Sequence, residues 1–368
     1  MKKNVLITFL GNIYYDTRCY NLFDALNKKD FSAKFVGFDW TSNNLSVQEE
    51  QISVHKLSRK YSSIFFYLRF NLLLLKSALF EKFEIIFAED LYTLPVCIIA
   101  GKFKRAKIIY DSRELFTHLA GLKDKKLLQS FWSFIEKLFI HKADIVLVTG
   151  EMDKDFLIEK YSLTNICLLR NLPLKQKPDR TIDFYELLKI NPAKKILLYQ
   201  GVVLHGRGLG ITFNVLQKSE TFVLVILGEG DLLSYYKNLA STMNVSDKVF
   251  FLGRINQTEL INYTSAAFLG LALIENVSLS YYYALPNKLF EYIMAETPAV
   301  VSNLPQMKHI IEKYNVGLCV DLDNEDLLEK LEQLVTNEHL YKQLKQNCRT
   351  AAKELCWENE INNLFERI

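Results

Sequence analysis

Short runs of β-branched and other apolar residues recur along the whole chain, separated by segments with helical spacing. Such runs are typical of strands buried on both faces of a parallel sheet. In the first half they fall at residues 5–9, 35–38, 85–88, 107–110, 145–149 and 166–169. Helical spacing appears between them, at residues 18–27, 94–102 and 127–142. The alternation predicts an α/β fold with a doubly wound parallel sheet.

The same alternation begins again after a charged stretch that contains Pro173, Pro178 and Pro192. New strand candidates follow at residues 196–199, 222–227, 249–252, 270–274, 299–302 and 317–321. We therefore expect two Rossmann-like domains, over residues 1–170 and 194–350, joined by a linker over 171–193. A last helical segment, 351–368, is expected to cross back onto the first domain. Because ligands bind at the carboxyl ends of such strands, we expect function in the loops that line a cleft between the domains.

Composition narrows the range of partners and compartments. The 45 basic and 42 acidic residues give a net charge of only +3, which offers no general reason to expect a nucleic-acid partner. Six cysteines occur without a C-x-x-C pair, as in proteins with reduced thiols. The most apolar stretch, 64–80, is interrupted by Arg69, Asn71 and Lys76, so it is not expected to span a bilayer. We expect a cytoplasmic protein.

One segment rich in basic and aromatic residues, 59–76, is compatible with contact to the inner face of a membrane. Residues 59–76 mix cations, aromatic residues and leucines as an interfacial helix does, beginning with Arg59, Lys60 and Tyr61. A helix that covers a sheet and extends its cations to the solvent would explain the same residues. The excess of basic residues in the first half is compatible with peripheral contact to anionic lipid.

The segment over residues 284–302 is the most informative about chemistry. Pro286 and Asn287 open a predicted helix, on which Lys288 and Glu291 share one face of the first turn. A lysine at a helix N-terminus can bind phosphate, and a carboxylate one turn later can accept hydrogen bonds from the ribose diol. An ion pair between these two residues on the surface would explain the same pattern.

This segment resembles the donor-binding motif of the family-4 retaining glycosyltransferases, which have the GT-B fold, in the subgroup whose motif reads P-N-K-L-F-E-Y. The resemblance covers nearly the whole chain. The further matching segments are residues 15–18, 110–116, 171–173, 199–201, 207–209, 226–230 and 251–254. It implies two Rossmann-like domains facing across a cleft, with the donor on the second domain and the acceptor on the first.

Cleavage of a sugar–diphosphate bond builds negative charge, which fixed cations can neutralise without a metal. Arg207 and Lys288 are the candidate catalytic residues for this role. The resemblance implies that Glu291 binds the ribose and that the loop of Gly253 and Arg254 binds the base. The other donor-binding candidates are Asn287, Gly208, Gly228, Gly230 and Gly11. A tight turn or a strand end would explain each of these glycines equally well.

Acceptor contacts are expected from the first domain. The candidates are Asp16, Arg18, Asp111 and Arg113, although both aspartates could act simply as helix caps. Arg113 stands where relatives usually carry a histidine. The six histidines are isolated and form no metal-binding spacing, so no metal or other cofactor is expected.

Three positions depart from the family pattern. Tyr283 stands eight residues before Glu291, where the family has a first glutamate, and Glu275 is the nearest upstream acid. Val202 replaces an arginine. Glu296 replaces a glycine, and because glutamate resists left-handed backbone geometry we expect a different turn there.

The resemblance therefore implies a retaining glycosyltransferase that moves a sugar from a UDP- or GDP-linked donor to a glycan or lipid-linked acceptor, in bacterial surface polysaccharide synthesis. Two alternatives remain: a sugar-nucleotide epimerase of the same fold, and a non-catalytic glycosyltransferase-like partner subunit. The first would need carboxylates placed for proton transfer. The second would fit the departures at Val202, Tyr283 and Glu296.

Overall fold

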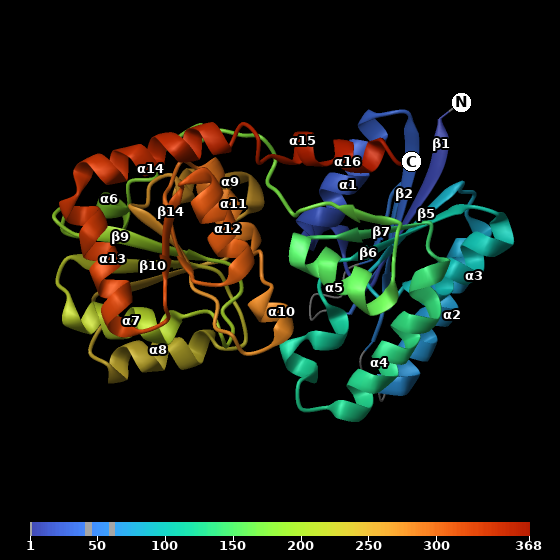
Figure 1. The fold of residues 1–368 in the computed structure, drawn as a ribbon, viewed down its shortest axis with the longest axis horizontal. Coiled ribbons are helices and arrows are strands. Elements are labelled where there is room, and N and C mark those ends of the chain that lie inside the picture. The colour runs from blue at the N-terminus through green and yellow to red at the C-terminus, as the bar shows by residue number, and fades with distance from the viewer. Residues whose placement is uncertain (1, 41–45, 59–62) are drawn as a thin grey trace. The chain divides into compact units, whose positions relative to one another are not determined.

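The structure is a computed structural model that describes residues 2–40, 46–58 and 63–368 (Figure 1). The chain divides into two compact units, each built around one sheet. Unit 1 comprises Met1–Arg170 and Ile361–Ile368, and unit 2 comprises Asn171–Glu360. The residues expected as a linker, 171–193, belong to unit 2, whereas the last eight residues belong to unit 1.

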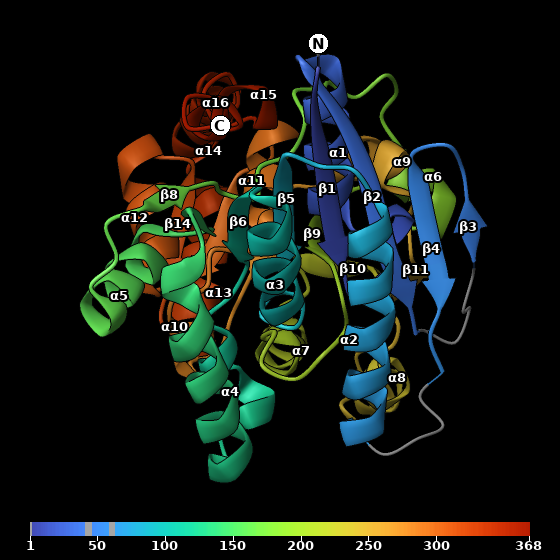
Figure 2. The same ribbon diagram turned by 90° about the vertical axis from the view of Figure 1, so that its right-hand side faces the viewer.

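Unit 1 holds an eight-stranded sheet in the order β3-β4-β2-β1-β5-β6-β7-β8. Its strands are β1 (Lys3–Phe9), β2 (Phe31–Asp39), β3 (Val47–Gln48), β4 (Ile52–Lys56), β5 (Ile85–Glu89), β6 (Lys107–Ser112), β7 (Ile145–Val148) and β8 (Ile166–Leu168). Among the described strands of this sheet, only the pairing of β3 with β4 is antiparallel. The helices are α1 (Thr17–Lys28), α2 (Ser63–Phe80), α3 (Leu94–Lys104), α4 (Lys126–Phe139), α5 (Glu151–Tyr161) and α16 (Asn362–Phe365). Figure 2 shows α2, α3 and α4 together on one side of the sheet.

The sequence pattern identified the central strands of unit 1 but missed β3 and β4. The buried strands β5 and β7 are continuous apolar runs, which the pattern detects. In contrast, β4 alternates buried Ile52 and Val54 with polar residues, and β3 is two residues long. Strands of this kind, at the sheet edge and next to it, lack the continuous apolar run that marks a fully buried strand.

Unit 2 holds a six-stranded parallel sheet in the order β11-β10-β9-β12-β13-β14. Its strands are β9 (Lys195–Gln200), β10 (Phe222–Leu227), β11 (Val249–Gly253), β12 (Leu269–Ala272), β13 (Ala299–Ser302) and β14 (Gly317–Val320). Its helices are α6 (Phe184–Leu188), α7 (Leu209–Lys218), α8 (Leu233–Thr242), α9 (Gln257–Thr264), α10 (Leu279–Tyr282), α11 (Asn287–Met294), α12 (Pro305–Tyr314), α13 (Asn324–Thr336), α14 (Glu338–Ala351) and α15 (Trp357–Glu360). The strand order reverses between β9 and β12, and ligands of doubly wound sheets bind at such a switch point. The predicted doubly wound fold is confirmed in both units.

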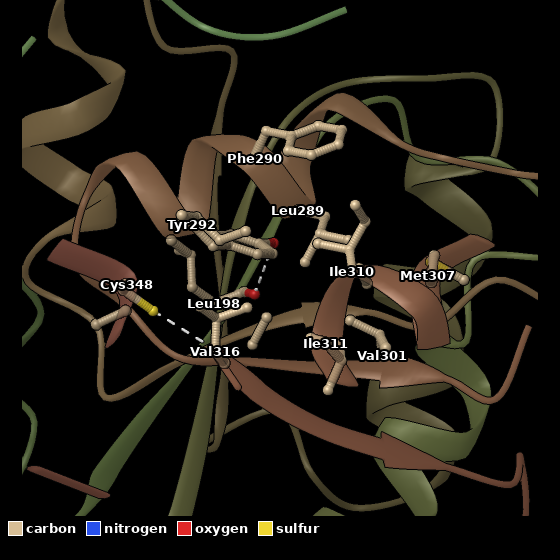
Figure 3. Close-up of a cluster of buried hydrophobic side chains, with 14 of the residues drawn as sticks. Leu198, Leu289, Phe290, Tyr292, Val301, Met307, Ile310, Ile311, Val316 and Cys348 are labelled. Carbon is tan, nitrogen blue, oxygen red and sulfur yellow. Dashed lines mark hydrogen bonds between the residues drawn. The ribbon is translucent and has the colours of Figure 1, made fainter. Parts of the chain in front are cut away.

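Helix α11 is fixed over this switch point by its buried face. Leu289, Phe290 and Tyr292 lie in the core between α11 and the sheet (Figure 3). The Tyr292 hydroxyl lies 3.1 Å from the carbonyl oxygens of Leu198 in β9 and Leu271 in β12. A rigid contact to both strands sets the position of the first turn of α11, which carries Lys288.

Candidate functional site

Lys288 occupies an unusual position for a lysine. Its side chain is only 8% exposed, and its Nζ lies 3.7 Å from the centroid of the Tyr199 ring at the end of β9. Within the described part of the chain, no carboxylate oxygen lies within ion-pair distance of this Nζ. The ion pair with Glu291 that the sequence left open is therefore not formed. A buried ammonium without a carboxylate is costly unless an anion binds it.

The electrostatic surroundings of Lys288 disfavour its charge. Burial lowers the pKa of Lys288 well below its usual range, and the positive charge of Arg207 lowers it further. Glu291 acts in the opposite direction but does not compensate. An incoming dianion would reverse this balance and favour the protonated amine.

Arg207 approaches the same place from the loop after β9. Its guanidinium carbon lies 4.9 Å from the centroid of the Tyr281 ring, and the group is partly exposed. Its charge acts on both Lys288 and Tyr199, so the two predicted catalytic cations belong to one electrostatic neighbourhood. The sequence places them 81 positions apart, and the fold brings them together at the switch point of unit 2.

The backbone between β9 and α7 requires glycine at position 208. Gly208 has φ +68°, and a Cβ there would lie 2.3 Å from the Cβ of Leu273. Its amide at the N-terminus of α7 donates to Glu275 Oε1 over 3.3 Å. The amide of this donor-binding candidate thus meets a carboxylate of the loop after β12. The sequence identified Glu275 only as the nearest acid upstream of Tyr283, which stands where the family has its first glutamate.

Gly228 and Gly230 allow two backbone segments to touch. A Cβ at Gly228 would lie 1.9 Å from the carbonyl oxygen of Gly201, and one at Gly230 would lie 2.4 Å from that of Val203. Both glycines therefore pack the loop after β10 against the loop after β9. Their contact with a donor stays a prediction.

Glu291 faces two glutamine side chains instead of a cation. Gln200 at the end of β9 and Gln257 at the start of α9 both donate amide hydrogens to its carboxylate. Thr264 in turn donates to the Gln200 side-chain oxygen over 2.8 Å. Glu291 and Gln257 also line a small pocket with Thr264. Gln200 and Gln257 were missed by sequence reasoning, although the position of Gln200 directly at a strand end was a usable signal.

The remaining donor candidates lie at the surface or in the other unit. Gly253 ends β11 with φ +73°, while Arg254 and Asn287 are exposed. Gly11 belongs to unit 1, where its carbonyl accepts from the Phe38 amide over 3.0 Å.

In unit 1, two of the four acceptor candidates are inaccessible in this structure. Arg18 and Asp111 are 2% and 0% exposed and form a two-point ion pair with N···O distances of 2.6 and 2.8 Å. Arg18 also donates to the Leu169 carbonyl over 2.8 Å. This geometry joins α1, β6 and the end of β8, and we assign the pair a supporting role. Asp111 is not the helix cap that the sequence left open.

Asp16 and Arg113 remain partly accessible and bind each other. Asp16 caps α1 by accepting from the Cys19 amide, and it pairs with Arg113 over 2.6 Å. Burial alone would raise the pKa of Asp16, but Arg113 lowers it below the usual range.

Two acids that sequence reasoning missed lie next to this pair. Glu89 is fully buried at the end of β5, with Oε2 4.0 Å from Arg113 Nε. Burial raises its pKa well above the ordinary value, and it raises that of Asp90 to about 7. Both follow an apolar run directly, which was the available signal.

Two of the positions that depart from the family pattern are Glu296 and Val202. The expectation of a different turn at Glu296 is wrong. Glu296 does adopt the left-handed geometry of a glycine, with φ +58°, in the turn that ends α11, where the Thr297 amide donates to the Tyr292 carbonyl over 2.9 Å. Arg349 pairs with the Glu296 carboxylate at 2.9 Å. Val202 is exposed, and only its carbonyl is used, accepting from the Tyr199 hydroxyl over 2.7 Å. Across residues 2–40, 46–58 and 63–368, no group of three or more His, Cys, Asp or Glu side chains is arranged to hold a metal ion.

Solved structures share the fold of this chain over nearly its whole length. Sucrose-phosphate synthase from Thermosynechococcus elongatus superposes with a TM-score of 0.81 at 16% identity, over 99% of this chain and 98% of that one. Anabaena HepE in complex with UDP-glucose superposes with a TM-score of 0.73 at 13% identity, over 99% and 98%. The predicted GT-B fold is confirmed.

The family match lies in unit 2. Residues 184–351, within unit 2, match the family described as "Glycosyl transferases group 1". The chain is 23% identical over 260 residues to alpha-monoglucosyldiacylglycerol synthase of Streptococcus pneumoniae, covering 65% of this chain and 57% of that protein. It spans less than three fifths of the length of the curated relatives it matches.

Proposed function

We propose that the chain is a retaining glycosyltransferase of the P-N-K-L-F-E-Y subgroup of family 4. It transfers a sugar from a nucleoside-diphosphate donor to a glycan or lipid-linked acceptor, in bacterial surface polysaccharide synthesis. The observation that carries the proposal is Lys288: a nearly buried ammonium without a carboxylate partner, beside a second cation, at the switch point of a Rossmann-like sheet. Such a site gains most from binding an anion with two negative charges.

The donor is held on unit 2 by groups with distinct roles. The diphosphate lies between Lys288 and Arg207, and the amide of Gly208 becomes available when Glu275 turns away. When the donor binds, the Glu291 carboxylate accepts hydrogen bonds from the ribose hydroxyls in place of those from Gln200 and Gln257. The UDP-glucose bound by the structural neighbour HepE supports a UDP-linked donor.

Lys288 and Arg207 are also suited to stabilise the diphosphate as the leaving group. When the bond from the sugar anomeric carbon to the phosphate oxygen breaks, the electron pair stays on the diphosphate. Lys288 and Arg207 stabilise that charge as it develops, so no metal is required. The ligand-free site lowers the pKa of Lys288, and a bound dianion favours the protonated amine, so binding of the dianion is coupled to proton uptake.

The acceptor is bound by unit 1, through Asp16 and Arg113. The acceptor hydroxyl attacks from the face that the diphosphate leaves and passes its proton to the diphosphate. The name of the Streptococcus pneumoniae relative, a synthase of a glycosylated diacylglycerol, supports a lipid-linked acceptor.

A thermal-shift titration with UDP, GDP, CMP and ADP tests the nucleotide site. We expect a concentration-dependent rise in Tm with one of the diphosphates, lost in Lys288→Ala and kept in the matched surface variant Lys308→Ala. No stabilisation by any nucleotide would favour the non-catalytic subunit. Stabilisation, followed by conversion of the nucleotide sugar without any acceptor, would favour the epimerase.

A further inference from the structure

Helix α4 of unit 1 carries an apolar stripe that nothing in unit 1 covers. Leu127, Phe131, Phe134 and Leu138 follow one another at steps of four, three and four residues, so they share one face of the helix. All four are exposed, by 44% to 90%. Large apolar side chains in a continuous row at the surface are typical of an interaction site.

The opposite face of α4 fixes the helix to unit 1. Trp132 contacts the rings of Tyr92 and Phe116 at 5.2 Å and that of Tyr67 in α2 at 5.6 Å. The buried Glu136 accepts a hydrogen bond from the Tyr161 hydroxyl over 2.7 Å. Because α4 is already packed on one face, its stripe is a second apolar face that folding of unit 1 does not require.

The charges around the stripe are almost all positive. Lys123, Lys125, Lys126 and Lys137 are exposed, whereas Asp124 is the one exposed acid among residues 121–142. Lys126 and Lys137 are eleven residues apart, about three helical turns, so they lie along one edge of the stripe. An apolar stripe edged by lysines is the pattern of a helix that lies in the interface of an anionic bilayer.

We infer that α4 is a membrane-docking helix that inserts Leu127, Phe131, Phe134 and Leu138 among the acyl chains of an anionic lipid surface, with its lysines at the headgroups. A second copy of the chain fits less well, because pairing two stripes would bring the lysines of one copy against those of the other. Across the described residues, no helix is both long and apolar enough to cross a bilayer, so the contact is peripheral.

This site differs from the run that the sequence suggested. Arg59, Lys60 and Tyr61 of that run lie outside the described residues. In α2, the described continuation, Phe66, Phe70 and Leu74 are buried, as expected for a helix that covers a sheet. The exposed residues of α2 include Phe65, Leu68 and Leu72, but the described part of α2 carries only Arg69 and Lys76 as cations. Figure 2 shows α2 and α4 on the same side of unit 1.

Co-sedimentation of the full-length chain with vesicles tests the inference. The probes are vesicles of phosphatidylglycerol with phosphatidylcholine and vesicles of phosphatidylcholine alone, at low and high salt. We expect binding to the anionic vesicles, weakened by salt. Phe131→Gln with Phe134→Gln, and separately the reversal of Lys125, Lys126 and Lys137 to Glu, should each weaken it about tenfold or more. Leu187→Gln with Tyr235→Gln, two exposed apolar residues of unit 2, is the matched control and should bind as the wild type does.

Two results would overturn the inference. One is wild-type binding to anionic vesicles by the α4 variants, whose fold is checked by circular dichroism. The other is a dimer in analytical ultracentrifugation that the Phe131 and Phe134 substitutions dissociate, which would assign the stripe to a second copy. Vesicle binding is measured without donor or turnover, so its failure would leave the proposed catalysis untouched.

Discussion

Replacing Lys288 with methionine should stabilise the ligand-free protein while removing its anion site. Methionine keeps the unbranched stem over the Tyr199 ring, where Lys288 Nζ now lies 3.7 Å from the centroid. It removes a charge that burial penalises and that no carboxylate neutralises in the described residues. A buried ion costs several kcal/mol after relaxation, and the aromatic ring returns about 2 kcal/mol of this.

The net gain is therefore of the order of 1–3 kcal/mol in the free energy of unfolding. For a unit of this size it corresponds to a rise in Tm of about 3–8 °C. The gain should shrink as the pH rises from 7 toward 10.5. Because the folded state lowers the pKa of Lys288, the folded chain releases this proton at a lower pH than the unfolded chain does, so the wild type becomes more stable as the pH rises toward the usual pKa of lysine.

Urea unfolding followed by circular dichroism at pH 7 and pH 9.5 measures both effects. Lys308→Met, an exposed lysine of α12, is the matched control, with an expected change below about 0.5 kcal/mol. A Lys288→Met protein that is less stable than the wild type at pH 7 would refute the reasoning. So would a gain in stability that does not change with pH, because the buried charge would then not be its source.

Three further variants test the separate parts of the two units. Glu275→Gln removes the negative charge at the Gly208 amide, so UDP or GDP should bind about three- to tenfold more tightly by calorimetry; weaker binding would show that the carboxylate assists the ligand. Glu291→Gln should lose about tenfold in affinity for the ribonucleotide but little for its 2′,3′-dideoxy analogue, and equal losses for both would rule out ribose recognition. Asp111→Asn leaves Arg18 buried and unpaired, so urea unfolding should show a loss of about 3–5 kcal/mol; a loss below about 1 kcal/mol would mean that the pair does not support unit 1.

The strands at the centre of both sheets could be predicted from sequence because they are fully buried. The segments 222–227 and 299–302 coincide with β10 and β13, since a continuous apolar run leaves little choice of structure. In contrast, β3 and β4 depend on pairing at a sheet edge, which a local pattern does not record. The two-residue strand β3 could not be predicted from its own residues.

The sequence named candidate residues for the site but could not show which side chains they contact. The motif indicated Lys288, Arg207 and Glu291, yet nothing local shows that Glu291 bonds to Gln200 and Gln257. Long-range pairs of this kind depend on which strand ends adjoin in the sheet. The left-handed backbone of Glu296 was predicted wrongly for a different reason: the turn that ends α11 imposes it, with the Thr297 amide donating to the Tyr292 carbonyl.

Dependence on distant partners also explains why Arg18 and Asp111 were predicted to contact the acceptor. Their sequence positions at a helix start and a strand end suggested access to a ligand. Their separation of 93 positions hides the fact that the fold joins them in a buried ion pair. Burial of a charged residue is decided by its distant partner, which local spacing does not reveal.

The central claim is that Lys288 and Arg207 together form the binding site of a diphosphate. Calorimetry that compares UDP with uridine, and GDP with guanosine, measures the diphosphate contribution directly. The account predicts that one nucleoside diphosphate binds at least about a hundredfold more tightly than its nucleoside, and that Lys288→Met with Arg207→Gln removes this difference. A double variant that keeps the wild-type ratio would contradict it.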